Sequence, residues 1–322
     1  MSYFQAIVIA LVQGVTELAP VSSLGHSVLV PAWIGGSWQT LVTQSSQATS
    51  ETSFYLAYIV ALHCATAVAL LWFFRADWVR IIRGFFRSLM PTVRERRIVA
   101  RDADERLAWL IVIATIPVGI TGLVLEHVFR TVFAKPLAAS VFLFVNGLIL
   151  LAGERVRRTA RPDLEEDAPL RDTDIDVRGS GARTAADVAT ARASDLRIAR
   201  LSYRDGLIVG LFQILALLAG ISRSGVSMVG GLLRGLNHED AARFAFLLAT
   251  PVIFAAGVLK LPSLAGSAGD HIHGQVAAGV VVTGITAYLS VRFLVKYFET
   301  RTLTPFAVYC LVVGAASVVR FV

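Results

Sequence analysis

Several side chains near the N-terminus can do acid–base or nucleophilic chemistry. Glu17 lies four residues after Gln13, so on a helix the two side chains share one face. Pro20 is expected to break that helix, and Ser23 and His26 follow within about one turn of the break. A carboxylate, a hydroxyl and an imidazole held this close can act as base, acid or nucleophile.

Two adjacent serines, Ser22 and Ser23, come directly after this break. We expect one of them to cap the restarting helix through a backbone N–H. The other can offer its hydroxyl to a phosphate group or to His26. An alternative interpretation is that Glu17 has no function and is an interfacial carboxylate whose side chain reaches water. Ionisable groups at membrane depth, however, usually have a function.

A second polar group interrupts an apolar stretch about two hundred residues later. It contains Gly220, Ser222, Arg223 and Ser224, and Ser227 follows one turn on. Glycine lets the backbone approach a ligand closely, and serines offer hydroxyl donors. An arginine supplies a planar, bidentate clamp for phosphate. Together the two groups predict a buried anion site, suited to phosphoester hydrolysis or to anion transport.

The composition indicates that membrane-spanning elements position these groups. The chain has 322 residues, of which 55% are hydrophobic and 16% are charged, against about 25% charged in ordinary soluble domains. Its mean hydropathy is +0.66. The net charge of +7 could suggest a nucleic-acid partner, but the arginines gather between apolar segments, where they signal orientation. We therefore expect a polytopic membrane protein that binds no nucleic acid.

The apolar segments predict an all-α fold of six transmembrane helices plus two re-entrant helical hairpins. Six segments can cross about 30 Å of hydrocarbon, at approximately 53–74, 107–126, 136–153, 241–261, 275–297 and 303–321. Two others, 3–34 and 204–236, are interrupted by the polar groups above. Irregular backbone at membrane depth must be surrounded by protein or by a water-filled cavity. Both stretches are therefore predicted to turn back within the bilayer.

Loop charge predicts the topology. Stretch 75–106 holds nine arginines and stretch 154–204 holds eleven, whereas 35–52 and 262–274 hold no lysine or arginine. The arginine-rich loops should be cytoplasmic. The two hairpins then enter from opposite sides, and their tips meet inside the membrane.

A weak internal repeat supports this arrangement. With a shift of 200 residues, Gln13–Ser27 aligns with Gln213–Ser227 at six identical positions of fifteen. Inverted repeats with broken helices are typical of many transporters. Within a single membrane domain over 1–322, we expect a first repeat over 1–153 and a second over 204–322, in inverted topology.

The segment between the repeats, 154–203, is predicted to be a cytoplasmic insertion. Its stretch 159–200 mixes charges with Ala, Thr and Gly and has almost no large apolar residues, so it is expected to be flexible and without a catalytic role. His63, on an apolar segment, is interpreted as a hydrogen-bonded core residue.

The two polar groups resemble the motifs of the undecaprenyl-diphosphatase, or bacitracin-resistance, family of bacterial membrane proteins. The matching residues of the first motif are Gln13, Glu17, Pro20, Ser22, Ser23, Gly25 and His26. The matching residues of the second are Gly220, Ser222, Arg223, Ser224 and Ser227. The resemblance covers nearly the whole chain apart from the insertion. Ala219 stands where the family has proline, Ser227 where it has threonine, and Gln13 is a family variant that removes one carboxylate.

The resemblance implies hydrolysis of undecaprenyl diphosphate to undecaprenyl phosphate, which recycles the carrier lipid of cell-wall synthesis and confers bacitracin resistance. It implies a bacterial inner-membrane protein whose site opens to the periplasmic side. It also implies a divalent cation, Mg²⁺ or Ca²⁺, with Glu17 as a candidate ligand. A homodimer is compatible with it.

For the reaction, Arg223, Ser222 and Ser224 are expected to bind the phosphates. Glu17 is expected to orient or deprotonate the attacking group, with Gln13, Ser22, Gly220 and Ser227 as further contacts. The attacking group is Ser23, His26 or water, and the sequence does not choose among them.

Two rival hypotheses remain. A transporter or flippase for the polyprenyl-phosphate lipid would use the same repeats and Arg223, but it would not need a titratable nucleophile. A scaffold protein that docks partners on its cytoplasmic insertion would need neither Glu17 nor Arg223 at membrane depth.

Overall fold

The computed structural model describes residues 1–41, 54–133, 135–160, 185–264 and 272–322, and every regular element within these ranges is helical. The helices of the first half are α1 (Tyr3–Thr16), α2 (Ser23–Ile34), α4 (Phe54–Phe73), α5 (Arg75–Glu95), α6 (Ala103–Phe133) and α7 (Pro136–Ala160). Those of the second half are α8 (Ala185–Ile198), α9 (Tyr203–Ile214), the 3₁₀ turn η1 (Leu215–Leu217), α10 (Arg223–Leu233), α11 (His238–Leu264), α12 (His273–Phe298) and α13 (Thr304–Phe321).

Long apolar helices confirm the predicted polytopic membrane fold. Among the described residues, five are long and apolar enough to cross a bilayer: α6, α7, α11, α12 and α13. A sixth candidate span is the pair of α4 and α5, which together pass the same test but are bent by 85° at their junction. The helices α4, α6, α7, α11, α12 and α13 overlap the six predicted spans.

Two helix pairs are too short to cross the membrane. The first hairpin consists of α1 and α2, and the second of α9 and α10; their helices have 11 to 14 residues. At 1.5 Å per residue, even 14 residues cover only about 21 Å of a hydrocarbon core of about 30 Å. In each pair the helix break lies at the polar group, as predicted from the sequence. The two helices of each pair pack against each other.

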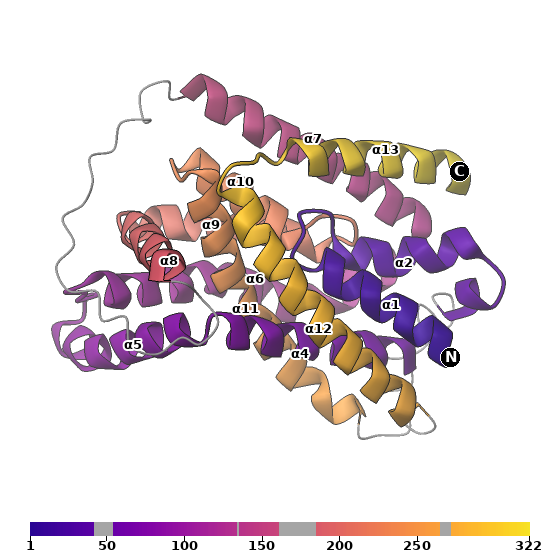
Figure 1. The fold of residues 1–322 in the computed structure, drawn as a ribbon, viewed down its shortest axis with the longest axis horizontal. Coiled ribbons are helices and arrows are strands. Elements are labelled where there is room, and N and C mark those ends of the chain that lie inside the picture. Colours follow the sequence, from indigo (N-terminus) through magenta and orange to yellow (C-terminus); the bar gives the residue numbers. More distant parts are fainter. Residues whose placement is uncertain (42–53, 134, 161–184, 265–271) are drawn as a thin grey trace.

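Each hairpin begins with a helix held by a span from the other half of the chain. Helix α1 packs along α12, where Thr283 Oγ1 donates to Ala10 O at 3.0 Å. Helix α9 packs along α6, where Gln213 Nε2 donates to Ala114 O at 3.0 Å. Helices α7 and α13 lie side by side along the upper edge of the molecule (Figure 1). These exchanged pairings fix the direction in which each hairpin points.

The connection after α4 differs from the predicted arginine-rich loop. Residues 75–95 form the helix α5, which packs on α6. Arg87 Nε donates to Glu105 Oε1 at 2.5 Å across this contact. The loop prediction was wrong here because the arginines alternate with apolar residues at helical spacing, so the segment is an amphipathic helix.

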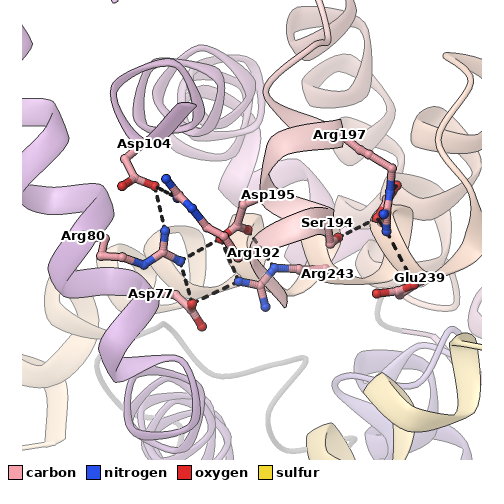
Figure 2. Close-up of polar contacts among 10 residues, drawn as sticks. Asp77, Arg80, Asp104, Arg192, Ser194, Asp195, Arg197, Glu239 and Arg243 are labelled. Carbon is pink, nitrogen blue, oxygen red and sulfur yellow. Dashed lines mark hydrogen bonds and ion pairs between the residues drawn. The ribbon is translucent and has the colours of Figure 1, made fainter. Parts of the chain in front are cut away.

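Part of the segment predicted to be a flexible insertion, 159–200, is helical in the structure, which corrects the prediction of flexibility there. Helix α8 carries Asp195, which is fully buried. Its carboxylate accepts from Arg80 of α5 at 2.7 Å and from Arg243 of α11 at 2.7 and 3.0 Å (Figure 2). Counter-charges on other elements hold α8 in place, and Ile198 at its end is fully buried in the hydrophobic core. The remaining stretch, 161–184, lies outside the described residues.

Candidate active site

The two hairpins cap their second helices in the same way. Ser22 is the N-cap of α2, and its Oγ accepts from the backbone N–H of Gly25 at 3.2 Å. Ser222 is the N-cap of α10, and its Oγ accepts from Gly225 N–H at 3.2 Å. Each hydroxyl satisfies one of the donors that a helix start leaves free. Ser22 therefore takes the capping role expected of one serine in its pair, which leaves Ser23 available.

The capping serines also join the two tips to each other. Ser22 Oγ accepts from Gly220 N–H at 3.2 Å, and Ser222 Oγ donates to Ala19 O at 3.2 Å. The backbones touch here, since a Cβ added to Gly25 would lie 2.9 Å from Gly220 Cα. Gly220 has φ of 117°, a conformation that glycine adopts without strain, whereas Ser22 has φ of 68° and is strained. The predicted meeting of the two tips is therefore present, and it is tight.

Asn146 of α7 fastens the tips together and was not among the predicted residues. It is fully buried. Its Nδ2 donates to Pro20 O at 3.0 Å, and its Oδ1 accepts from Ser222 N–H at 3.0 Å. Nδ2 also lies 3.3 Å from Cys310 Sγ of α13. One amide thus binds the breaking residue of the first hairpin and the capping residue of the second.

Glu17 is the centre of the polar contacts between the hairpins. Its Oε1 accepts a hydrogen bond from Arg223 of α10, and its Oε2 accepts one from the hydroxyl of Ser23. Gln13 Nε2 donates to Oε2 at 2.9 Å, and His63 Nε2 of α4 lies 3.4 Å from the same oxygen. The carboxylate side chain is 3% exposed, while Arg223 and His63 keep 18% and 20% of their side chains accessible. The site is therefore buried at its carboxylate and open at its basic groups.

His63 is more than the hydrogen-bonded core residue that the sequence suggested. Its Nδ1 does bond within its helix, to Ile59 O at 2.8 Å. Its Nε2 faces Glu17, however, so it belongs to the polar cluster. The signal available in the sequence was an ionisable side chain in the middle of an apolar span, which usually marks function.

His26 lies beside the Glu17 cluster and has other partners. One ring nitrogen, Nδ1, is 2.7 Å from Ser22 O, and the other, Nε2, is 2.7 Å from Tyr309 Oη of α13. The imidazole also stacks on the Tyr309 ring, with centroids 5.7 Å apart. Both ring nitrogens are thus occupied. Tyr309 was not predicted, because a tyrosine in the last span carries no sequence signal that links it to His26.

The remaining predicted residues frame the site. Ser224 Oγ lies 3.0 Å from Ser222 Oγ and 3.2 Å from Ala19 O, so both hydroxyls are turned toward the first hairpin. Ser227 is buried, and its Oγ has no hydrogen-bond partner in the part of the chain that the structure describes. Ala219 is also buried, so the turn keeps its place without the family's proline.

The donor set argues against a dedicated metal cage. Among the described residues, three or more His, Cys, Asp or Glu side chains do not gather anywhere in a way that could hold a metal ion. Glu17 supplies a single carboxylate, and its oxygens already face Arg223, Ser23 and Gln13. Hard cations such as Mg²⁺ and Ca²⁺ require several oxygen ligands, which this set does not provide without a bound phosphate.

Comparisons with known proteins identify the family of this chain. Residues 6–316 match the family described as bacitracin resistance protein BacA. Undecaprenyl-diphosphatase 2 of Frankia alni is 59% identical, with 100% of this chain and 98% of that protein covered. Undecaprenyl-diphosphatase of Mycolicibacterium paratuberculosis is 54% identical (99% and 97% covered), and undecaprenyl-diphosphatase 2 of Burkholderia orbicola is 39% identical (98% and 95% covered). The predicted resemblance is confirmed, and the chain belongs to the bacitracin resistance protein BacA family.

Proposed function

We propose that this chain hydrolyses undecaprenyl diphosphate to undecaprenyl phosphate and inorganic phosphate, and so recycles the carrier lipid of the bacterial cell wall. The names of full-length relatives at 54–59% identity support the substrate. The observation that carries the proposal is the contact of Glu17 with both Ser23 and Arg223, where the two hairpins meet. A carboxylate, a hydroxyl and a guanidinium in one buried cluster can supply the base, the nucleophile and the charge stabilisation of phosphoryl transfer.

The diphosphate is expected to replace Glu17 as the partner of Arg223. A guanidinium held at membrane depth needs an anionic partner, and it binds a phosphate in bidentate geometry. Helices α2 and α10 both begin where the two tips meet, and a helix start favours negative charge. The prenyl tail stays in the lipid between the helices. Arg223 then stabilises charge that develops on the transferred phosphoryl group.

Ser23 is proposed as the attacking group, and its contacts favour it over His26. Its hydroxyl already donates to Glu17, which can take its proton, whereas both nitrogens of His26 are bonded elsewhere. The Ser23 Oγ–P bond forms as the bond from the terminal phosphorus to the bridging oxygen breaks. The electron pair stays on that oxygen, which becomes a terminal oxygen of undecaprenyl phosphate.

The second half of the reaction regenerates Ser23. Water attacks the phosphoserine, the P–Oγ bond breaks, and Oγ recovers the proton that Glu17 had accepted. Inorganic phosphate leaves, and the proton lost by the water goes to phosphate or to solvent. His63 faces the same carboxylate oxygen and can relay protons from Glu17 toward the accessible side of the site.

A divalent cation, Mg²⁺ or Ca²⁺, is proposed to arrive with the diphosphate. Its ligands would be diphosphate oxygens, water and at most Glu17, since the protein side chains do not complete a cage. When bound, it would neutralise phosphate charge. We further propose that the site opens to the periplasmic side, because the arginine-rich stretches before α6 and before α9 mark the opposite side as cytoplasmic.

Phosphate release tests this function. Purified protein in detergent, supplied with undecaprenyl diphosphate and Mg²⁺ or Ca²⁺, should release inorganic phosphate. Glu17→Gln should lower kcat by about 10²–10⁴-fold as loss of a base, and Arg223→Lys by about 10²–10³-fold as loss of charge stabilisation. Glu95→Gln, an exposed change on α5, should leave the rate unchanged. If wild-type protein releases no phosphate but moves the lipid between leaflets, the transporter hypothesis replaces this one.

The attacking group can be identified by trapping. Substrate labelled on its terminal phosphate, mixed with enzyme and quenched after less than one turnover, should leave label on the peptide that carries Ser23. Ser23→Ala should abolish both the label and the release of phosphate. Label on His26 would contradict the assignment, and a full first turnover without labelled protein would point to direct attack by water.

A further inference from the structure

Helix α5 presents a continuous apolar stripe that no other element covers in the part of the chain that the structure describes. Its large exposed side chains recur at helical spacing of three or four residues, at Val79, Ile82, Phe86, Met90 and Val93. Phe86 is 66% exposed and Met90 76% exposed. Scattered single apolar residues are ordinary on a protein surface, but an aligned row of this length indicates an interaction surface.

The stripe cannot turn inward, because the opposite face of α5 is fixed to the protein. Asp77, Gly84 and Ser88 are buried on that face. A Cβ on Gly84 would lie 2.9 Å from the carbonyl carbon of Asp104, so α5 and α6 are in backbone contact. Arg80 bonds to Asp77 at 2.8 Å and to Asp104 and Asp195 at 2.7 Å (Figure 2). The helix is therefore held in one rotational position.

The direction of α5 places the stripe along the membrane surface. Helix α4 is a predicted span, and α5 leaves its end at 85°. A helix perpendicular to a span runs parallel to the bilayer, at the depth where the span ends. Its mixed composition, with five arginines in 21 residues, suits the boundary between headgroups and acyl chains and not the hydrocarbon centre.

A row of arginines borders the stripe on one side. At 100° per residue, Arg83, Arg87 and Arg94 project from the flank next to Met90. Arg87 pairs with Glu105 and Asp102 of the α6 start. Arg83 and Arg94 are exposed, and within the described ranges neither has an ion pair. Two exposed guanidinium groups beside an apolar stripe are suited to the phosphate groups of lipids.

We propose that α5 is an interfacial helix seated in the cytoplasmic leaflet. Its apolar stripe lies against the upper acyl chains, and Arg83 and Arg94 bind the phosphates of anionic phospholipids. This partner follows from the charge of the flank, the direction of the helix and its continuity with the lipid-facing spans. The binding surface is separate from the candidate active site and does not depend on the proposed reaction.

Depth-dependent fluorescence quenching tests whether the apolar stripe of α5 lies in the membrane. Met90→Cys is labelled with an environment-sensitive fluorophore in full-length protein in lipid nanodiscs; Glu95→Cys, on the other side of the same helix, is the matched control. Wild-type protein labelled in parallel measures any signal from Cys64 and Cys310. Lipids brominated near the top of the acyl chain should quench the probe at residue 90 strongly and that at 95 weakly, because interfacial helices sink roughly 5–10 Å.

Three results distinguish the possible occupants of the stripe. Quenching of residue 90 by the brominated lipids supports the proposal. Quenching of residue 90 by aqueous iodide to the same extent as residue 95 would show that the stripe faces water, and would overturn it. Ready disulfide formation between two Met90→Cys chains would assign the stripe to a second copy, and would overturn it as well.

The choice of lipid tests the arginine flank. At equal bromination, an anionic lipid should quench the probe at residue 90 more than a zwitterionic one, because each arginine near an anionic surface can enrich such lipids by up to about fivefold. Arg83→Gln combined with Arg94→Gln should remove this difference and keep the quenching itself. Equal quenching by both lipids in the parent protein would overturn the anionic part of the proposal.

Discussion

Asn146 offers a direct test of whether the contact between the hairpin tips sets the geometry of the site. The substitution Asn146→Ala removes an amide that is fully buried and bonded to both hairpins. Alanine retains the helical backbone of α7 and introduces no new polar group. The change therefore removes the amide contacts to Pro20 O and Ser222 N, together with the weaker contact to Cys310 Sγ.

The expected loss of stability follows from the backbone groups that the substitution leaves without a partner. Two backbone groups, one carbonyl and one N–H, would lose the partner that Asn146 supplies inside the protein. An unsatisfied buried group costs about 1–3 kcal/mol, so the pair costs about 2–6 kcal/mol. If the tips separate to recruit water, Glu17 and Arg223 also move, and a 1 Å misplacement of reacting groups can cost about 100-fold in rate.

The assay compares thermal stability with phosphate release. Ser140→Ala is the matched control, since Ser140 is a fully buried α7 residue whose Oγ bonds within its own helix, to Pro136 O at 2.7 Å. We expect Asn146→Ala to lower both the melting temperature and kcat with KM nearly unchanged, and Ser140→Ala to cost less than about 1 kcal/mol. Wild-type stability and kcat in Asn146→Ala would refute the role assigned to the amide.

Two further predictions concern the scaffold. Gly210→Ala should destabilise the protein by about 1–3 kcal/mol or prevent folding, because the new Cβ would lie 2.4 Å from Ala114 O. Gly119→Ala is the control. A Cβ there would have nothing within 4 Å, so this variant should be neutral in the same thermal melt. Asp195→Asn should free α8 by breaking buried ion pairs worth about 3–5 kcal/mol. Trypsin should then cut within 185–200 far faster than in wild type; unchanged cleavage would contradict the anchoring role.

The sequence predicted the parts of the site that lie in local motifs. Glu17 and Ser23 are six residues apart across one helix break, so any tight turn at Pro20 brings them close. Arg223 could be assigned to the same site because its surroundings repeat the pattern around Ser22 at a fixed offset. A cation at membrane depth needs an anion, and Glu17 was the available carboxylate. Local spacing and charge compensation together were sufficient for this pair.

The residues that support the site could not be predicted from the sequence, for a different reason. Asn146, His63 and Tyr309 are single polar residues within long apolar helices, and each meets its partner from a distant part of the chain. Their roles depend on which face of each span is turned inward, and hydropathy alone does not decide that. The ordering of α8 was missed for a related reason, since its buried Asp195 is satisfied by arginines on other elements.

The two hairpins show how one local structure can serve two purposes. At matched positions 200 residues apart, Ser22 and Ser222 make the same cap, and each also bonds the opposite tip. The glycines three residues later make matching contacts: a Cβ on Gly25 would meet Gly220, and one on Gly225 would lie 3.2 Å from Pro20. Conserving these contacts in both halves keeps the tips in register.

The chemistry lies at the positions that do not match. Glu17 has Leu217 as its counterpart, and Ser23 has Arg223. A strictly symmetric site would bring two carboxylates or two guanidinium groups together away from water, where like charges cannot both stay ionised. Because one tip supplies the base and the hydroxyl and the other supplies the cation, the charges compensate each other until a phosphate enters. The matched positions thus hold the site together, and the unmatched ones make it reactive.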